Sequence, residues 1–230
     1  MNTDIVEILP TDEHQYSVIW LHGLGASGSD FESIVSFLNI DKQSHIHFIF
    51  PNAPIQSVTI NNGMEMRSWY DIYDLSLERK VDVSGIYQSS DSIVKLIEQE
   101  IAKGIGSENI LLAGFSQGGV IALHTGLRYP NQLAGILGLS TYLPTLEQLN
   151  NEASKANKTI PIMMAHGSSD PIVNINTAKK VFNTLKDSNY PISWAEYPME
   201  HAVCQEEIDD ITDFINRVFN NLERKSWQLI

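Results

Sequence analysis

Short apolar segments rich in β-forming residues alternate with segments of helical periodicity along most of this chain. Residues 16–21 are a clear case of the first kind and residues 86–102 of the second. The expected strands are 16–21, 45–50, 110–115, 133–139, 160–165 and 192–197, and the expected helices are 30–38, 86–102, 117–129, 177–186 and 205–222. Such alternation is typical of α/β proteins, in which helices cover both faces of a mostly parallel sheet. We expect residues 1–230 to form a single α/β domain, with Ser29 or Asp30 capping its first helix.

The chain is acidic, with a formal net charge of −13 at pH 7. This charge argues against a nucleic-acid partner and against electrostatic attachment to anionic lipid. Cys204 is the only cysteine, so an intrachain disulfide is excluded, which is typical of a reducing compartment. The N-terminus lacks a signal-peptide pattern, and no apolar run approaches the roughly 18 residues of a membrane helix. We expect a cytoplasmic protein, whose membrane contact would have to be apolar and peripheral.

The most informative motif is Gly114-Phe115-Ser116-Gln117-Gly118, which lies between an expected strand and an expected helix. A serine hydroxyl is a weak nucleophile and must be presented beside a base. The G-x-S-x-G pattern does this through a tight strand-to-helix turn, and the helix N-terminus directs its amides toward a developing oxyanion. We interpret Ser116 as a nucleophile rather than as a structural serine at a Gly-rich helix start.

Two further motifs follow expected strands. Asp170 lies in His166-Gly167-Ser168-Ser169-Asp170-Pro171, and His201 closes Tyr197-Pro198-Met199-Glu200-His201. Alone, Asp170 is as well explained by a turn or helix cap, and a lone histidine is more often structural. Together with Ser116, however, they have the Ser…Asp…His order of α/β-hydrolases, each after its own strand. We predict that Asp170 orients His201, which acts as the base.

Such a site also needs donors for an oxyanion. One is expected to be the backbone N–H of Gln117, and the other that of Leu24, in the loop His22-Gly23-Leu24-Gly25. His22 and His166 each precede a glycine in these loops, and we interpret them as scaffolding that hydrogen-bonds loop backbone.

The rival motifs are weaker. Cys204 and His124 are read as packing residues. His45 and His47 would share one face of a strand, but no third ligand is apparent, so a metal site is not expected. The chain lacks a P-loop and a G-x-G-x-x-G motif that opens a helix after a strand, so no cofactor is indicated.

The chain resembles the family of acyl-protein thioesterases, lysophospholipases and small carboxylesterases over nearly its whole length. The matching stretches are 18–25 (VIWLHGLG), 50–54 (FPNAP), 58–63 (VTINNG), 69–72 (WYDI), 112–119 (LAGFSQGG), 139–144 (LSTYLP) and 197–201 (YPMEH). The resemblance implies an α/β-hydrolase fold, a triad of Ser116, Asp170 and His201, and oxyanion donors at Leu24 and Gln117. It also implies activity on acylated proteins, lysophospholipids or simpler carboxylic esters. Relatives carry an acidic residue at Ala26 and usually a glycine at Glu200, a carboxylate that could raise the pKa of His201 or repel anionic substrates.

The acyl chain of such a substrate needs an apolar groove. We expect its walls to come from residues 64–77, with Trp69, Leu75 and Leu77, and from Val173. The alternative, that these residues only pack their loop against the body, is equally open. The same segment could dip into lipid to collect substrate, with apolar contact in place of the missing positive charge.

Other functional readings remain open. A non-catalytic lipid- or protein-binding module could use the same fold, and a carboxylesterase for short soluble esters could use the same site. The apolar tail 227–230 could pack on a second copy of the chain, as in a homodimer, or fold back on the body.

Overall fold

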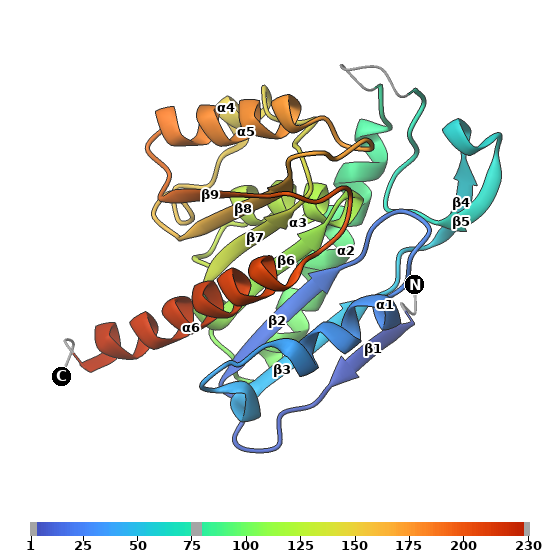
Figure 1. The fold of residues 1–230 in the computed structure, drawn as a ribbon. Helices are drawn as coiled ribbons and strands as arrows, with labels where there is room; N and C mark the ends of the chain where they lie inside the picture. Colours follow the sequence, from blue (N-terminus) through green and yellow to red (C-terminus); the bar gives the residue numbers. More distant parts are fainter. Residues whose placement is uncertain (1–3, 75–79, 228–230) are drawn as a thin grey trace.

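A computed structural model describes residues 4–74 and 80–227, with side chains up to residue 220. The chain forms a seven-stranded sheet in the order β1-β3-β2-β6-β7-β8-β9 and a separate β4–β5 hairpin (Figure 1). The sheet strands are β1 (Ile5–Ile8), β2 (Tyr16–Leu21), β3 (Ile46–Pro51), β6 (Ile110–Phe115), β7 (Gly135–Leu139), β8 (Ile162–Gly167) and β9 (Ile192–Tyr197). The helices are α1 (Gly28–Glu32), α2 (Val83–Ala102), α3 (Gln117–Arg128), α4 (Leu149–Glu152), α5 (Ile175–Asp187) and α6 (Gln205–Trp227), with 3₁₀ turns η1 (Ser33–Phe37), η2 (Gln43–His45), η3 (Thr59–Asn61) and η4 (Ser107–Asn109).

Six of the sheet strands run parallel, and the edge strand β1 pairs antiparallel with β3. The expected mostly parallel sheet is therefore confirmed. Strand β1 is not apparent from the sequence, because Glu7 interrupts its apolar residues and the four residues form no continuous apolar run.

Helices cover both faces of the sheet, as Figure 1 shows. Along β2, Ile19 and Leu21 point into the core under α2, α3 and α5, whereas Val18 and Trp20 point into the core under α1 and α6. This division follows from the alternation of side chains along a strand, and because both faces are covered, every residue of β2 is buried.

Several boundaries differ from expectation. The first helix begins after Ser27, whose capping box with Asp30 replaces the expected cap at Ser29 or Asp30, and it passes into the 3₁₀ turn η1. Strand β8 extends through Gly167, so His166 lies within the strand rather than after it. Residues 55–67 form a hairpin of β4 (Ile55–Val58) and β5 (Met64–Arg67), with Asn62 left-handed at the turn.

None of the helices among the described residues combines the length and apolar character needed to cross a membrane.

Candidate active site

Ser116, Asp170 and His201 meet beyond the carboxyl ends of β6, β8 and β9. The Oγ atom of Ser116 lies 2.9 Å from Nε2 of His201, and Nδ1 of His201 lies 2.7 Å from Oδ2 of Asp170. Parallel strands place their carboxyl ends at one edge of the sheet, which explains how residues 85 and 31 positions apart come together. The arrangement gives one line of hydrogen bonds from a hydroxyl through an imidazole to a carboxylate.

Ser116 occupies a strained turn between β6 and α3. Its backbone is at φ 54° and ψ −118°, a conformation that L-residues rarely adopt. The N–H of Ser116 donates to the carbonyl of Leu139 at 2.8 Å, and the Thr141 hydroxyl donates to the carbonyl of Ser116 at 2.7 Å. At Gly118, a Cβ atom would collide with the carbonyl oxygens of Leu21 and His22. The turn therefore fits only because strand and helix approach without an intervening side chain.

The Asp170 carboxylate is held on both oxygens. Oδ1 accepts the backbone N–H groups of Ile172 and Val173 at 2.8 and 2.9 Å, while Oδ2 faces His201. The Asp170 side chain is fully buried, whereas that of His201 keeps 16% of its surface exposed. This geometry leaves the carboxylate one main task, to accept the Nδ1 proton of His201 and fix the ring's orientation.

His166, which was expected to hydrogen-bond loop backbone, also contacts Asp170. Its Nε2 lies 2.9 Å from the Val173 carbonyl and 3.3 Å from Oδ2 of Asp170. A carbonyl accepts only, so Nε2 carries the proton. Burial lowers the pKa of His166, which is consistent with a neutral ring, and the ring stacks on Trp194 at a centroid distance of 6.0 Å.

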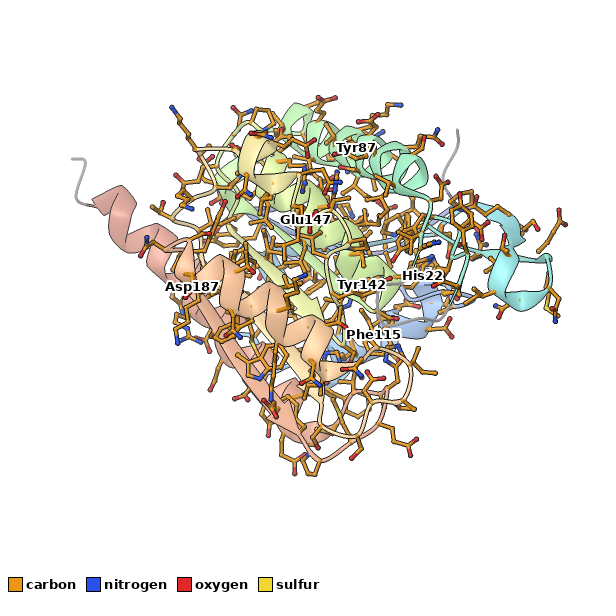
Figure 2. All side chains as sticks on the ribbon, turned by 90° about the horizontal axis from the view of Figure 1, so that it is seen from above. His22, Tyr87, Phe115, Tyr142, Glu147 and Asp187 are labelled. Carbon is orange, nitrogen blue, oxygen red and sulfur yellow. The ribbon has the colours of Figure 1, made fainter. Side chains whose placement is uncertain are left out.

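His22 pins the neighbouring loop in the same way. Nδ1 donates to the carbonyl of Gly23 at 2.7 Å, and Nε2 accepts the N–H of Ala53 at 3.0 Å. These partners fix the tautomer, and burial lowers the pKa of His22. His22 directly follows β2, and Phe115 ends the neighbouring strand β6; Figure 2 labels both residues. The expectation that His22 and His166 hydrogen-bond loop backbone is confirmed.

The expected oxyanion donors flank Ser116. Gly23 lies so close that a Cβ atom there would be 3.4 Å from the Cβ of Ser116, which brings the Leu24 loop next to Ser116. The amides of Gly25 and Ala26 donate to Arg67 and Gly23, while the Leu24 N–H has no acceptor among residues 4–74 and 80–227. Gln117 is the first residue of α3, where backbone N–H groups lack an intrahelical acceptor.

Of the residues expected to line an acyl groove, the two that the structure describes are buried. Trp69 is 3% exposed and donates its indole N–H to the carbonyl of His22, and Val173 is 3% exposed in the same core. Both pack their loops against the body, although a role in substrate binding stays a prediction. Leu75 and Leu77 lie outside the described residues. Ile172, which sequence reasoning passed over, is 51% exposed beside the carboxylate of Asp170.

The remaining candidates lie elsewhere. Glu200 is exposed, and its influence on His201 and on substrates stays a prediction. Cys204 is half-buried against the core under α6, as expected of a packing residue. His124 is buried, with its Nδ1 2.8 Å from the Thr145 hydroxyl, and burial together with Arg128 lowers its pKa to about 3. His45 lies in η2 and its Nδ1 faces the carbonyl of Glu13, so it does not share a strand face with His47.

Residues 2–219 match the phospholipase/carboxylesterase family. Acyl-protein thioesterase 1 of Schizosaccharomyces pombe is 42% identical over 185 residues, which are 79% of this chain and 82% of that protein.

Solved structures agree with this match. SOBER1 of Arabidopsis thaliana superposes with a TM-score of 0.85 at 31% identity, covering 89% of this chain and 99% of that one. Acyl-protein thioesterase 2 of Zea mays gives 0.83 at 26% identity, covering 94% and 99%. The expected α/β-hydrolase fold is confirmed. The chain therefore belongs to the phospholipase/carboxylesterase family and is a serine hydrolase of carboxylic esters.

Proposed function

We propose that Ser116, His201 and Asp170 act as a catalytic triad that hydrolyses acyl thioesters and esters through an acyl-enzyme. The observation that carries the proposal is the unbroken line of hydrogen bonds, 2.9 and 2.7 Å long, from Ser116 Oγ through His201 to Asp170. Both distances lie in the range needed for direct proton transfer.

The proposed reaction has two steps, formation of the acyl-enzyme and its hydrolysis. His201 Nε2 takes the proton of Ser116 as Oγ forms a bond to the acyl carbon, whose carbonyl oxygen becomes an oxyanion. The tetrahedral intermediate collapses, the bond to the leaving thiol or alcohol breaks, and His201 returns its proton to that group. Water then repeats the sequence: His201 deprotonates it, the hydroxide attacks the acyl carbon, and Ser116 Oγ leaves with the proton held on His201. Asp170 stabilises the imidazolium formed in both steps.

The backbone N–H groups of Leu24 and Gln117 are the proposed oxyanion donors. Support comes from the absence of another acceptor for Leu24 N–H among the described residues, and from the place of Gln117 at the start of α3, where the helix dipole adds to the attraction. The loss of one such donor typically costs about 10²–10³ in kcat.

The substrate class we propose is a fatty-acyl thioester on a protein. Relatives that span most of the chain are acyl-protein thioesterases, and the exposed side chain of Ile172 next to Asp170 offers an apolar contact at the site entrance. A carboxylesterase of short, soluble esters would use the same atoms and differ only in acyl-chain preference. Hydrolysis rates for a series of acyl lengths, measured on matched esters and thioesters, separate the two.

Contact with a membrane is the remaining part of the proposal. Ile55 and Met64, at the two ends of the β4–β5 hairpin, are 65% and 64% exposed. Liposome flotation with Ile55→Glu and Met64→Glu tests it, with charged substitutions at Leu75 and Leu77 as a further pair. Unchanged flotation in all four variants would count against membrane contact.

The decisive test of the triad uses an active-site label. A fluorophosphonate probe should label the wild type and Ser36→Ala, in which an exposed serine is removed, but not Ser116→Ala. Ser116→Ala should also lose turnover of an activated thioester, while its circular dichroism spectrum stays the same as that of the wild type. Wild-type protein that neither labels nor turns over ester would favour the alternative of a non-catalytic lipid- or protein-binding module.

A further inference from the structure

A second cluster of chemically reactive side chains lies near the amino ends of the parallel strands, away from Ser116. Ser17 and His47 face each other near the amino ends of β2 and β3, where they form a register pair. His14 precedes β2, and Glu100 comes from the last turn of α2. Ser116, in contrast, follows the carboxyl end of β6, so this cluster is separate from the proposed triad.

Three of the four residues are almost completely withdrawn from water. Ser17, His47 and Glu100 are 0%, 2% and 1% exposed. The side chain of His14 keeps 21% of its surface exposed and so forms the solvent side of the cluster. A carboxylate buried beside two imidazoles is unusual in a core and needs a compensating partner.

The donor atoms converge on one oxygen. Oε2 of Glu100 lies 3.5 Å from Nε2 of His14, 3.0 Å from Nδ1 of His47 and 2.7 Å from Oγ of Ser17. Oγ of Ser17 is also 3.0 Å from Nε2 of His14. One ligand atom each from His14, His47 and Glu100 can be chosen so that all lie within 4.8 Å of one another.

We propose that His14 Nε2, His47 Nδ1 and Glu100 Oε2 bind a divalent transition-metal ion of the zinc class. Bonds of about 2.0–2.1 Å in a tetrahedral site place ligand atoms about 3.3 Å apart, close to the separations between Glu100 Oε2 and the two rings. Ser17 Oγ, or a water reaching the site past His14, completes four ligands. Imidazole nitrogen with carboxylate oxygen suits Zn²⁺ and its neighbours, whereas Mg²⁺ and Ca²⁺ prefer oxygen alone.

The surroundings orient the ligands for this task. Nε2 of His47 has no aligned hydrogen bond among the described residues, yet it lies 3.2 Å from Oε1 of Glu7, whose side chain is 42% exposed. A small turn of Glu7 would let it accept the Nε2 proton, leaving the Nδ1 lone pair for the metal, as metal-bound histidines usually require. Lys103 binds Oε1 of Glu100 at 2.6 Å, so Oε2 remains directed toward the two imidazole rings.

Charge also favours a cation. With both imidazoles neutral, Glu7 and Glu100 contribute two negative charges and Lys103 one positive charge. A divalent ion more than offsets the one remaining negative charge, and it takes the place of the hydrogen bonds that Glu100 accepts from Ser17 and His47.

A metal here would stabilise the fold without touching the reaction. It would link the end of α2 to the amino ends of β2 and β3, at the end of the sheet away from Ser116. Zn²⁺ at about 100 times its Kd should raise Tm by roughly 5–10 °C, with kcat of a soluble thioester unchanged in metal-buffered solution.

The test uses chelator-treated full-length protein and Co²⁺, whose visible absorption reports tetrahedral binding, together with Tm in zinc-buffered solution. The wild type should take up one equivalent at this site. His14→Ala should weaken that binding by roughly 100-fold or more and Glu7→Gln by roughly 10–100-fold, and the Tm rise should shrink in step. His45→Ala, a nearby histidine outside the cluster, and His201→Ala should keep the equivalent.

Two results would overturn the proposal: wild-type protein without saturable Co²⁺ binding, or binding that His14→Ala leaves unchanged. Because His14 is partly exposed, this variant is expected to fold, which circular dichroism checks. If Glu100→Gln also folds, it must lose the equivalent. Either overturning result would leave the cluster as a hydrogen-bond network and would not affect the triad, which shares no residue with it.

Discussion

The side-chain amide of Gln117 holds the backbone of Trp69. Its Oε1 accepts the Trp69 N–H at 2.8 Å, and its Nε2 donates to the carbonyl of Tyr70 at 2.7 Å. Gln117 is 3% exposed, and its backbone N–H is one of the proposed oxyanion donors. Gln117 therefore connects the turn that carries Ser116 to the backbone of Trp69 and Tyr70.

Gln117→Ala should lower the free energy of unfolding by about 1–3 kcal/mol, because the buried Trp69 N–H loses its acceptor. The backbone donor remains, so kcat/KM should fall by less than the 10²–10³ typical of a lost oxyanion donor. Urea unfolding and thioester hydrolysis measure the two effects. Gln88→Ala, at an exposed position of α2, is the control and should change neither. A Gln117→Ala protein as stable as the wild type would show that the tie contributes nothing.

Asp170→Asn should leave the fold intact and lower kcat by about 10⁴. The amide oxygen can still accept the N–H groups of Ile172 and Val173, but the amide nitrogen would then face Nδ1 of His201 with a proton of its own. His201 would be driven to the tautomer that cannot accept the Ser116 proton. Single-turnover kinetics with an activated thioester test this, and Asp91→Asn on the exposed face of α2 is the control. A loss of less than 10-fold would contradict the role of Asp170.

Gly167→Ala should reduce kcat/KM by about 10², the usual effect of misplacing a catalytic group by about 1 Å. A Cβ atom at residue 167 would overlap the backbone carbonyl oxygens of Met199 and Glu200, which shape the loop that carries His201. The fluorophosphonate labelling rate should fall with activity. Ser168→Ala, the adjacent exposed residue, is the matched control and should leave both unchanged.

The elements that could be predicted from the sequence are those with a run of β-forming residues or a clear helical period. The strands at Tyr16–Leu21, Ile110–Phe115 and Ile192–Tyr197 have the expected bounds. Segments that are short or half-exposed, such as β1 and the β4–β5 hairpin, give patterns too weak to define their strands.

The same distinction applies to the sites. Ser116, Asp170 and His201 could be found because each follows its own strand, and parallel strands end at one edge. The tie from Gln117 to Trp69 and the contact of His47 with Glu100 join residues 48 and 53 positions apart. Only the packing of α2 and α3 on the sheet brings such pairs together, so no spacing in the sequence announces them.

Glu207, in the first turn of α6, should make the protein less stable as the pH rises. Burial raises the pKa of its carboxyl from 4.5 to about 8, with Asp210 adding to the effect and the backbone of Cys204 opposing it. Neither carboxyl oxygen has a well-aligned hydrogen-bond partner among the described residues. Because the folded-state pKa is the higher one, the stabilising contribution is complete below about pH 4.5 and is lost progressively toward pH 8.

Glu207→Gln removes this titration and should therefore be more stable than the wild type at pH 8.5, by an amount on the order of a few kcal/mol. The gap should close as the pH falls toward 5, where the wild-type carboxyl is protonated in the folded protein. Urea unfolding at four or five pH values across this range measures it. Glu206→Gln is the control, since that neighbouring side chain is exposed and should leave the pH profile unchanged. Parallel profiles for the wild type and Glu207→Gln would show that Glu207 is ionised in the folded state throughout and that burial does not hold its proton.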